Sequence, residues 1–200
     1  MTIKQLEYND YKDQKYKTKI LSDAYLSIEP AGDGFDIKWV KVNEPLVKEL
    51  EDNMLSEWLD HPVAYGAFDS NGKLIGFVEG FLEEWNNRYR ITNICVFDSD
   101  ARGKGIGGKL LDIIIEEAKK SGARMAVLET QSYNSKAISF YKKYGFQIIG
   151  FDRYAYSNHG PEDCNMRIEM GRISYCYLKR YASCARSPKS SRRGGDPART

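Results

Sequence analysis

Histidine and cysteine are scarce in this chain of 200 residues, which has two histidines and four cysteines. They form no CxxC, HExxH or other spacing typical of a metal site: the histidines are His61 and His159, and the cysteines are Cys95, Cys164, Cys176 and Cys184. Two of the cysteines, Cys176 and Cys184, lie in a C-terminal segment of different composition, so no disulfide framework is predicted. We therefore expect neither a structural zinc site nor any other metal.

Long apolar runs are absent as well. No run approaches the roughly 18 residues that are needed to span a bilayer as a helix. Residues 1–19 alternate charged residues with tyrosines and lack the apolar block of a signal peptide. These absences predict a cytoplasmic protein that does not associate with a membrane.

A large net charge is also lacking, because the whole chain carries only +2. Residues 173–200 contribute +6 of this total, so residues 1–172 carry −4. A mildly acidic body argues against nucleic acid as the main partner. The segment 173–200 is rich in Ser, Pro, Gly and Arg, and we interpret it as a disordered or non-native basic tail. A nucleic-acid-binding arm is the alternative.

The chain does contain enough apolar residues, 42%, for one globular domain. We divide it into an N-terminal lead-in with a first strand (1–34), a main domain (35–172) and the tail. Residues 35–42 alternate apolar and polar side chains, which predicts a half-buried strand. Apolar positions three or four residues apart predict a helix over 46–59, opened by Pro45. An antiparallel meander of three strands is then expected at 63–68, 73–82 and 89–97.

The second half of the main domain has a different pattern. Apolar spacing predicts helices at 105–121 and 135–144. The continuously apolar centre of 124–130 predicts a strand that is covered on both faces, and further strands are expected at 146–156 and 165–171. A meander followed by alternating strands and helices predicts an α+β domain with helices packed on a mixed sheet.

The segment before the helix at 105–121 reads RGKGIGG over 102–108, with four glycines in six residues. Glycines let successive backbone N–H groups converge on one point, and the unpaired N–H groups at a helix start attract anions. Arg102, Lys104 and Lys109 add positive charge. These features predict a pyrophosphate site, and a flexible basic surface loop is the simpler alternative.

Gly103, Gly105 and Gly108 also satisfy the dinucleotide fingerprint G-x-G-x-x-G. That fingerprint sits on a tight strand-to-helix turn in a parallel βαβ unit. Here several polar residues intervene, the preceding strands are expected to be antiparallel, and too little chain follows for a doubly wound sheet. We therefore reject a dinucleotide-binding fold.

Two motifs together resemble the GCN5-related N-acetyltransferase (GNAT) superfamily. Arg102-x-x-Gly105-x-Gly107 is similar to its acyl-CoA pyrophosphate loop, and NSKAISFYKKYGF over 134–146 is similar to its N-x-x-A-x-x-F-Y-x-x-x-G-F segment. The resemblance covers roughly 35–172. It implies a mixed, mostly antiparallel sheet with helices on both faces, and acetyl-CoA as cosubstrate.

Four shorter segments resemble streptothricin acetyltransferases, which acetylate the β-lysine arm of that antibiotic and confer resistance. They are EWNNR (84–88), RITNI (90–94), LETQ (128–131) and AYSN (155–158). The resemblance implies direct transfer of an acetyl group to a primary amine of a small molecule. A protein lysine or N-terminal acetyltransferase, a non-catalytic CoA-binding module and an RNA-associated factor remain alternatives, and the chain is expected to be a monomer or a homodimer.

The superfamily resemblance also implies which residues contact acetyl-CoA. A backbone N–H near 94–96 would stabilise the charge that develops on the thioester oxygen, provided that this strand splays from its neighbour. Tyr141 would protonate the leaving thiolate, although its spacing also suits core packing. The implied contacts are Ile94, Cys95, Val96, Arg102, Gly103, Lys104, Gly105, Ile106, Gly107, Gly108, Asn134, Ala137, Phe140 and Tyr141.

The acceptor amine must lose a proton before it can attack, because an amine of pKa about 10.4 is almost entirely charged at pH 7. Many members of the superfamily carry a glutamate at the centre of the strand at 89–97, where this chain has Thr92-Asn93. The best-placed candidate bases are Glu79 and Glu83 at the end of one strand and Glu129 near the end of another. These three and Glu84 could instead bind a cationic acceptor, and Glu83 and Glu84 could simply be turn residues. Candidate acceptor contacts are Glu79, Glu84, Trp85, Asn87, Asn93 and Tyr156.

Overall fold

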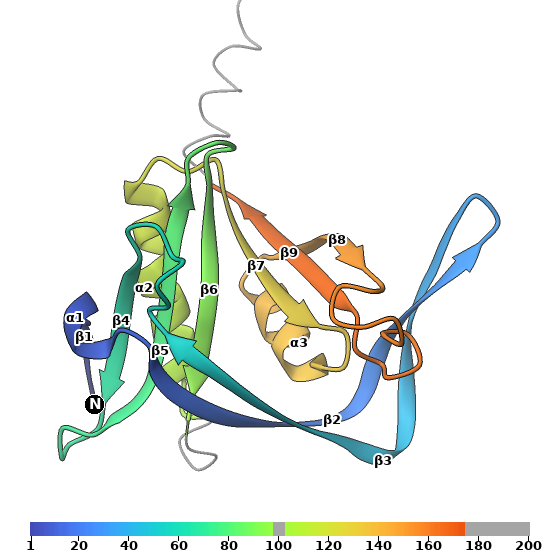
Figure 1. The fold of residues 1–200 in the computed structure, drawn as a ribbon, viewed down its shortest axis with the longest axis horizontal. Helices are drawn as coiled ribbons and strands as arrows, with labels where there is room; N and C mark the ends of the chain where they lie inside the picture. The colour runs from blue at the N-terminus through green and yellow to red at the C-terminus, as the bar shows by residue number, and fades with distance from the viewer. Residues whose placement is uncertain (98–102, 175–200) are drawn as a thin grey trace, which may run out of the picture.

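The computed structural model describes residues 1–97 and 103–174. It contains a seven-stranded sheet of order β1-β4-β5-β6-β7-β9-β8 and a separate two-stranded sheet, β2-β3 (Figure 1). Neighbouring strands of the large sheet are antiparallel except β6 and β7, which confirms the predicted α+β class. The elements are β1 (Thr2–Gln5), α1 (Tyr8–Tyr11), β2 (Gln14–Ala31), β3 (Gly34–Met54), β4 (Val63–Phe68), β5 (Leu74–Glu83), β6 (Arg88–Val96), α2 (Ile106–Lys120), β7 (Met125–Gln131), α3 (Ser135–Lys143), β8 (Gln147–Asp152) and β9 (Arg167–Ile173).

Two apolar clusters cover the two faces of the large sheet. The adjacent residues Phe77 and Val78 of β5 belong to different clusters, as expected when successive side chains of a strand point to opposite faces. The larger cluster contains Val78 and the buried sides of α2 and α3, including Leu110 and Ile138. The smaller one contains Phe77 and is covered by α1 and its neighbours. Helices α2 and α3 therefore pack on one face of the sheet, and the single turn of α1 packs on the other.

The predicted helix at 46–59 is wrong, because β3 continues to Met54 and the strand predicted at 35–42 is only its first part. The helix was inferred from apolar positions such as Leu46, Leu50 and Met54, which are four residues apart. A spacing of four also keeps side chains on one face of a strand, so it does not separate the two periods. Residues 46–54 form a strand because they pair with β2, with Leu46 opposite Ser22 and Met54 opposite Gln14.

The other elements agree with the sequence patterns to within a few residues. The meander at β4, β5 and β6 is confirmed, as are α2, β7, α3 and β9. Strand β8 ends at Asp152, so the segment around Tyr156 is part of a turn-rich connection instead of the predicted strand. The interpretation of 173–200 as a tail falls almost wholly outside the described residues. In the part of the chain that the structure describes, no helix is long and apolar enough to cross a membrane.

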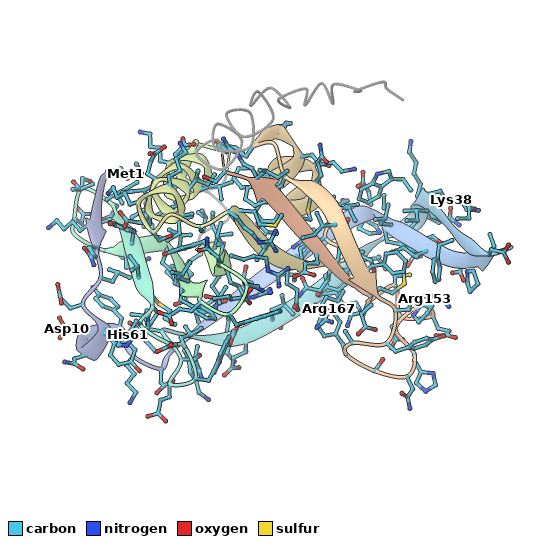
Figure 2. The ribbon with its side chains drawn as sticks, turned by 90° about the horizontal axis from the view of Figure 1, so that it is seen from above. Met1, Asp10, Lys38, His61, Arg153 and Arg167 are labelled. Carbon is cyan, nitrogen blue, oxygen red and sulfur yellow. The ribbon has the colours of Figure 1, made fainter. Side chains whose placement is uncertain are left out.

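The β2-β3 hairpin is a long ribbon that runs past the large sheet and extends beyond it (Figure 1). Seen from above, Lys38 near its tip lies at the opposite end of the molecule from Met1 (Figure 2). The ribbon is attached at the start of α3, where the Ser22 and Ser135 hydroxyl oxygens are 2.5 Å apart and the Leu26 N–H donates to the Ser132 carbonyl (2.9 Å). These contacts hold the ribbon across the side of the sheet where β6 and β7 part.

Candidate active site

The site begins where β6 and β7 stop pairing. Their parallel register runs only from Arg88 opposite Met125 to Ile91 opposite Leu128. Beyond Ile91 the strand β6 diverges from β7, as the sequence analysis required for an accessible backbone near 94–96. A cavity of about 850 Å³ fills this gap, lined by residues of β2, β3, β6, β7 and α3. That volume is in the range of small-molecule sites.

The predicted pyrophosphate loop leads into the N-terminus of α2. Gly105 is the N-cap residue, with a left-handed backbone (φ +79°), and its carbonyl accepts the first helical hydrogen bond, from the Lys109 N–H. A Cβ at Gly107 would lie 3.9 Å from Val96 and 3.7 Å from Phe140, which places this helix start beside the β6 and α3 walls. Residues 103–109 do not line the cavity themselves, but Val96 beside Gly107 does, and the first-turn N–H groups have no partner within the helix, as binding of a phosphate requires.

The remaining loop residues follow the same pattern. Gly103 and Lys104 are exposed, and Lys104 can supply a mobile positive charge. Ile106 and Gly108 are buried, so their side of the helix packs on the core while the backbone N–H groups remain available at the helix start. Arg102 lies outside the described residues. Unpaired N–H groups and an exposed lysine are groups that bind a pyrophosphate, and the site at this loop stays a prediction.

The second predicted motif forms α3 on the other side of the gap. The Asn134 side chain caps the helix by accepting from the Ala137 N–H at 3.3 Å, and it also lines the cavity. Phe140 is half-buried and its ring contacts Tyr141. Tyr141 is buried (7% exposed) but lines the cavity. Burial raises the pKa of the Tyr141 phenol, so it is protonated at neutral pH and can donate.

Ile94, Cys95 and Val96 line the same cavity on the β6 side. Cys95 is also packed in the smaller apolar cluster, 9% exposed. This position favours a buried small apolar side chain over a nucleophile. The divergence of β6 from β7 brings this stretch of backbone to the cavity, where the sequence analysis expects an N–H to stabilise a developing oxyanion.

Glu79 is completely buried and lies behind the cavity wall instead of in it. Its Oε1 accepts from Asn93 Nδ2 (2.8 Å) and from Thr92 Oγ1 (3.2 Å), and its Oε2 accepts from the Leu55 N–H (2.7 Å). Burial raises the pKa of the Glu79 carboxyl, and these hydrogen bonds partly oppose that effect. Asn93 lines the cavity and accepts from the Tyr16 hydroxyl at 2.7 Å.

Glu83 is engaged in a set of ion pairs at the end of β5. Arg88 Nε lies 3.2 Å from its Oε2, Arg90 pairs with its Oε1, and Arg90 also reaches Glu169 at 3.2 Å. Partial burial alone would raise the pKa of the Glu83 carboxyl, but hydrogen bonds from Arg90 and Asn86 lower it below its ordinary value. A carboxylate held in its charged form by two arginines is poorly suited to act as a base.

Glu84, Trp85 and Asn87 form the turn between β5 and β6, away from the residues that line the cavity. Asn87 Nδ2 donates to the carbonyl of Gly122, just past the C-terminal end of α2 (3.3 Å). A helix of 15 residues is about 22 Å long, so this turn lies far from Gly105 at the other end. Trp85 is 84% exposed. The structure does not bring these three candidate acceptor contacts to the cavity, because they belong to the opposite end of the hairpin.

Glu129 lines the cavity from β7, whereas Tyr156, in the connection after β8, does not line it and contacts Glu129 instead. The Tyr156 hydroxyl donates to Glu129 Oε1 at 2.7 Å, and Arg167 Nη1 lies 3.9 Å from Oε2. Glu129 remains partly exposed. These contacts bring two predicted site residues together across a long stretch of chain and leave the carboxylate accessible.

Sequence reasoning missed the wall that the β2-β3 ribbon contributes. Tyr16 and Thr18 of β2 line the cavity, together with Asp52 of β3 and Trp58 after it. The alternation KYKTKI over 15–20 was a signal for a strand with one face of Tyr, Thr and Ile, but it was assigned to the lead-in.

Comparisons with known proteins agree with this geometry. The model of the Acetyltransferase (GNAT) family matches residues 33–146. Streptothricin acetyltransferase of Streptomyces lavendulae is 32% identical over 142 residues, covering 68% of this chain and 75% of the relative. Streptothricin acetyltransferase A of Bacillus subtilis (strain 168) is 31% identical over 125 residues, covering 59% and 68%.

Two solved structures share the fold across most of their length. The crystal structure of nourseothricin acetyltransferase has a TM-score of 0.68 at 25% identity and covers 86% of this chain and 97% of its own. A protein of Bacillus anthracis str. Ames, solved in complex with acetyl coenzyme A, has a TM-score of 0.65 at the same identity and coverage. The family match over more than half of the chain, together with these relatives, shows that the chain belongs to the acetyltransferase (GNAT) family and is an acetyl-CoA-dependent N-acetyltransferase.

Proposed function

We propose that the acceptor is a primary amine of streptothricin or of a closely similar polyamine antibiotic, acetylated by direct transfer in a ternary complex. The relatives in Streptomyces lavendulae and Bacillus subtilis are streptothricin acetyltransferases, and the structural likeness to nourseothricin acetyltransferase spans 86% of this chain. One observation of the site carries the proposal: carboxylates from two different walls, Asp52 on β3 and Glu129 on β7, line a single cavity beside Tyr141.

The charge of these two carboxylates is suited to an acceptor with several ammonium groups. Cavity-lining Glu51 pairs with Lys15 and Lys17, which compensate its charge. Asp52 has no ion pair within 4.0 Å among the residues that the structure describes, and its Oδ1 accepts from the Asn53 N–H (2.8 Å). A cationic acceptor would therefore gain attraction from Asp52 without breaking an ion pair, and it would compete at Glu129 with the 3.9 Å pair to Arg167.

The chemistry assigns a task to each part of the site. Acetyl-CoA, when bound, supplies an acetyl thioester whose carbonyl gains negative charge as the amine attacks. The α2 start and Lys104 would hold the pyrophosphate, and Asn134, Ala137 and Phe140 would form the adjoining wall. A backbone N–H of Ile94–Val96 would stabilise the oxyanion. Tyr141 would donate a hydrogen bond or a proton to the leaving sulfur, whose thiol has an ordinary pKa of about 8.5.

Removing one of the two acidic charges is expected to weaken the binding of the acceptor without weakening that of acetyl-CoA. Asp52→Asn or Glu129→Gln should raise the KM for streptothricin about 2- to 5-fold, because a partly exposed ion pair contributes up to about 1 kcal/mol. The KM for acetyl-CoA should not change. Steady-state kinetics at two salt concentrations would measure both constants, and added salt should raise the streptothricin KM of the wild type more than that of either variant.

Glu116→Gln is the matched control, since Glu116 is an exposed carboxylate on α2 that lies outside the cavity. Equal KM values for streptothricin in Asp52→Asn, Glu129→Gln and Glu116→Gln would contradict the role of the two carboxylates.

The acceptor itself is tested by offering the purified protein streptothricin, free lysine, polyamines, aminoglycosides and lysine peptides with acetyl-CoA. We expect the highest kcat/KM with streptothricin. Efficient acetylation of a peptide without acetylation of streptothricin would reject the antibiotic and support a protein acetyltransferase. If the protein consumes no acetyl-CoA with any of these amines, the result would support a CoA-binding module without catalysis.

A further inference from the structure

The centre of β6 lacks a carboxylate of its own, but the neighbouring strand supplies one to it. In the β5–β6 register Glu79 lies opposite Asn93 and Gly80 lies opposite Ile91, so Thr92 is an extra residue in β6. Such a bulge turns two consecutive side chains toward one partner residue. Here both Thr92 and Asn93 donate to the same atom, Glu79 Oε1, at 3.2 and 2.8 Å.

The bulge residues separate Glu79 from the cavity. Thr92 and Asn93 line the cavity, whereas Glu79 is 0% exposed and does not line it. A proton from a bound amine can therefore reach Glu79 through one of these two side chains. The Asn93 amide nitrogen is only a donor, but a threonine hydroxyl donates one proton and can accept another at the same oxygen. Thr92 is thus the side chain that can pass a proton inward.

We propose that Thr92 relays a proton from the acceptor's ammonium group to Glu79. This inference rests on the proposed amine acetylation and names the proton acceptor for it. The ammonium N–H bond breaks as its proton binds Thr92 Oγ1, while the original hydroxyl proton of Thr92 moves to Glu79 Oε1. The amine is then neutral and holds the electron pair that forms the C–N bond.

The remaining protons balance within the site. As the C–N bond forms and the C–S bond of the thioester breaks, the second proton of the nitrogen leaves for the sulfur, with Tyr141 as the donor beside it. After the acetylated product departs, the proton on Glu79 returns through Thr92 to water. Each turnover thus releases one proton for each ammonium that is acetylated, and Thr92 and Glu79 are restored.

The groups around Glu79 tune this transfer. Asp52 of β3 raises the pKa of the Glu79 carboxyl by its negative charge, in addition to burial. Tyr16 of β2 interacts electrostatically with Glu79, and the Tyr16 phenol remains neutral near pH 7 because burial raises its pKa. Of these groups, Glu79 is the one whose protonation the proposed relay changes.

Thr92→Val and Glu79→Gln test the relay, with Thr92→Ser as the conservative variant. Thr92→Val keeps the shape and removes the hydroxyl, so we expect kcat to fall about 10- to 100-fold. Glu79→Gln should lose a similar factor, and the double variant should lose no more than either single one, because both act in one step. Thr92→Ser should restore most of the activity that Thr92→Val loses.

The pH dependence separates proton transfer from a structural role. In the wild type, kcat/KM should fall as pH drops through the pKa of Glu79, since the protonated carboxyl cannot accept. In Thr92→Val and Glu79→Gln this acidic limb should disappear, and activity should rise toward the amine's pKa of about 10.4, where the neutral amine exists in solution. An unchanged acidic limb in folded Thr92→Val, checked by circular dichroism, would overturn the relay.

The assay uses whichever amine the wild type acetylates best. If that amine is not streptothricin, the proposed acceptor fails while the relay is still tested by the pH profiles. If streptothricin is acetylated but Thr92→Val is as active as the wild type, the relay fails and the proposed function stands.

Discussion

Tyr141→Phe is expected to lower kcat about 10- to 1,000-fold while the KM for acetyl-CoA stays within a few-fold of the wild-type value. The substitution keeps the ring that packs between Phe140 and Phe146 and removes only the hydroxyl. Because Tyr141 is buried yet lines the cavity, its hydroxyl is in a poorly solvated position, where a hydrogen bond to a developing thiolate is stronger than in water.

The direction of the Tyr141 pKa explains why the effect should be on turnover. Burial raises the pKa of the Tyr141 phenol, so the phenol remains protonated and uncharged through the working pH range. Without this proton donor the leaving sulfur is less stabilised in the transition state. The contacts that bind acetyl-CoA in the ground state remain, so the KM for acetyl-CoA changes little.

Tyr89→Phe is the matched control for this loss. Tyr89 is also buried, and its hydroxyl donates to the Gly80 carbonyl at 3.3 Å, but it does not line the cavity. Its removal should cost roughly 1 kcal/mol of stability without lowering kcat. Steady-state kinetics and thermal unfolding of both variants would separate the two effects. Full activity in folded Tyr141→Phe would reduce Tyr141 to a packing residue.

Patterns that are local in sequence could be predicted. The helix over Ile106–Lys120 follows from apolar positions at helical spacing, and its start at Gly105 follows from the run of glycines. The α3 segment from Asn134 to Tyr141 carries its own cap and its own buried face. In each case the residues that determine the structure lie within about ten positions of one another, so the pattern is complete in one window.

The ribbon could not be predicted in the same way, because its partner strand lies far along the chain. Leu46 pairs with Ser22 and Asp52 pairs with Tyr16, so each half of the ribbon is stable only when the other is present. Alone, residues 46–54 satisfy both a helical and a strand period, and the choice depends on long-range hydrogen bonds. The alternation over 15–20 indicates a strand, but it does not reveal that Asp52 lies opposite Tyr16, so the cavity wall that these two residues form was missed.

The carboxylates show the same division. Glu79, Glu83 and Glu84 are close in sequence and are all predicted site residues, but the fold separates them. Glu79 is buried against Asn93, and Glu83 is held by Arg88 and Arg90. Which carboxylate faces the cavity depends on strand register and on a bulge, and a change of one residue in register reverses the face of every side chain.

Gly105→Val is expected to raise the KM for acetyl-CoA about 10- to 100-fold. Gly105 has φ +79°, a conformation that costs a residue with a side chain about 1–2 kcal/mol, and more when the residue is β-branched. Among the described residues, no atom lies within 4 Å of the place that a Cβ would take there, so the substitution strains the backbone instead of causing a clash. A relaxed backbone would turn the first N–H groups of α2 away from the phosphates, and charge-assisted hydrogen bonds of about 1.5–3 kcal/mol would be weakened.

Gly122→Val separates this effect from a general loss of stability. Gly122 follows the C-terminal end of the same helix and has φ +74°, and a Cβ there would likewise meet no atom of residues 1–97 and 103–174 within 4 Å. Both variants should therefore lose a similar free energy of unfolding, about 1–3 kcal/mol, in urea titrations. Only Gly105→Val should raise the KM for acetyl-CoA, because only the N-terminal end presents unpaired N–H groups to an anion. Equal KM values for acetyl-CoA in the two folded variants would contradict binding of the pyrophosphate at the start of α2.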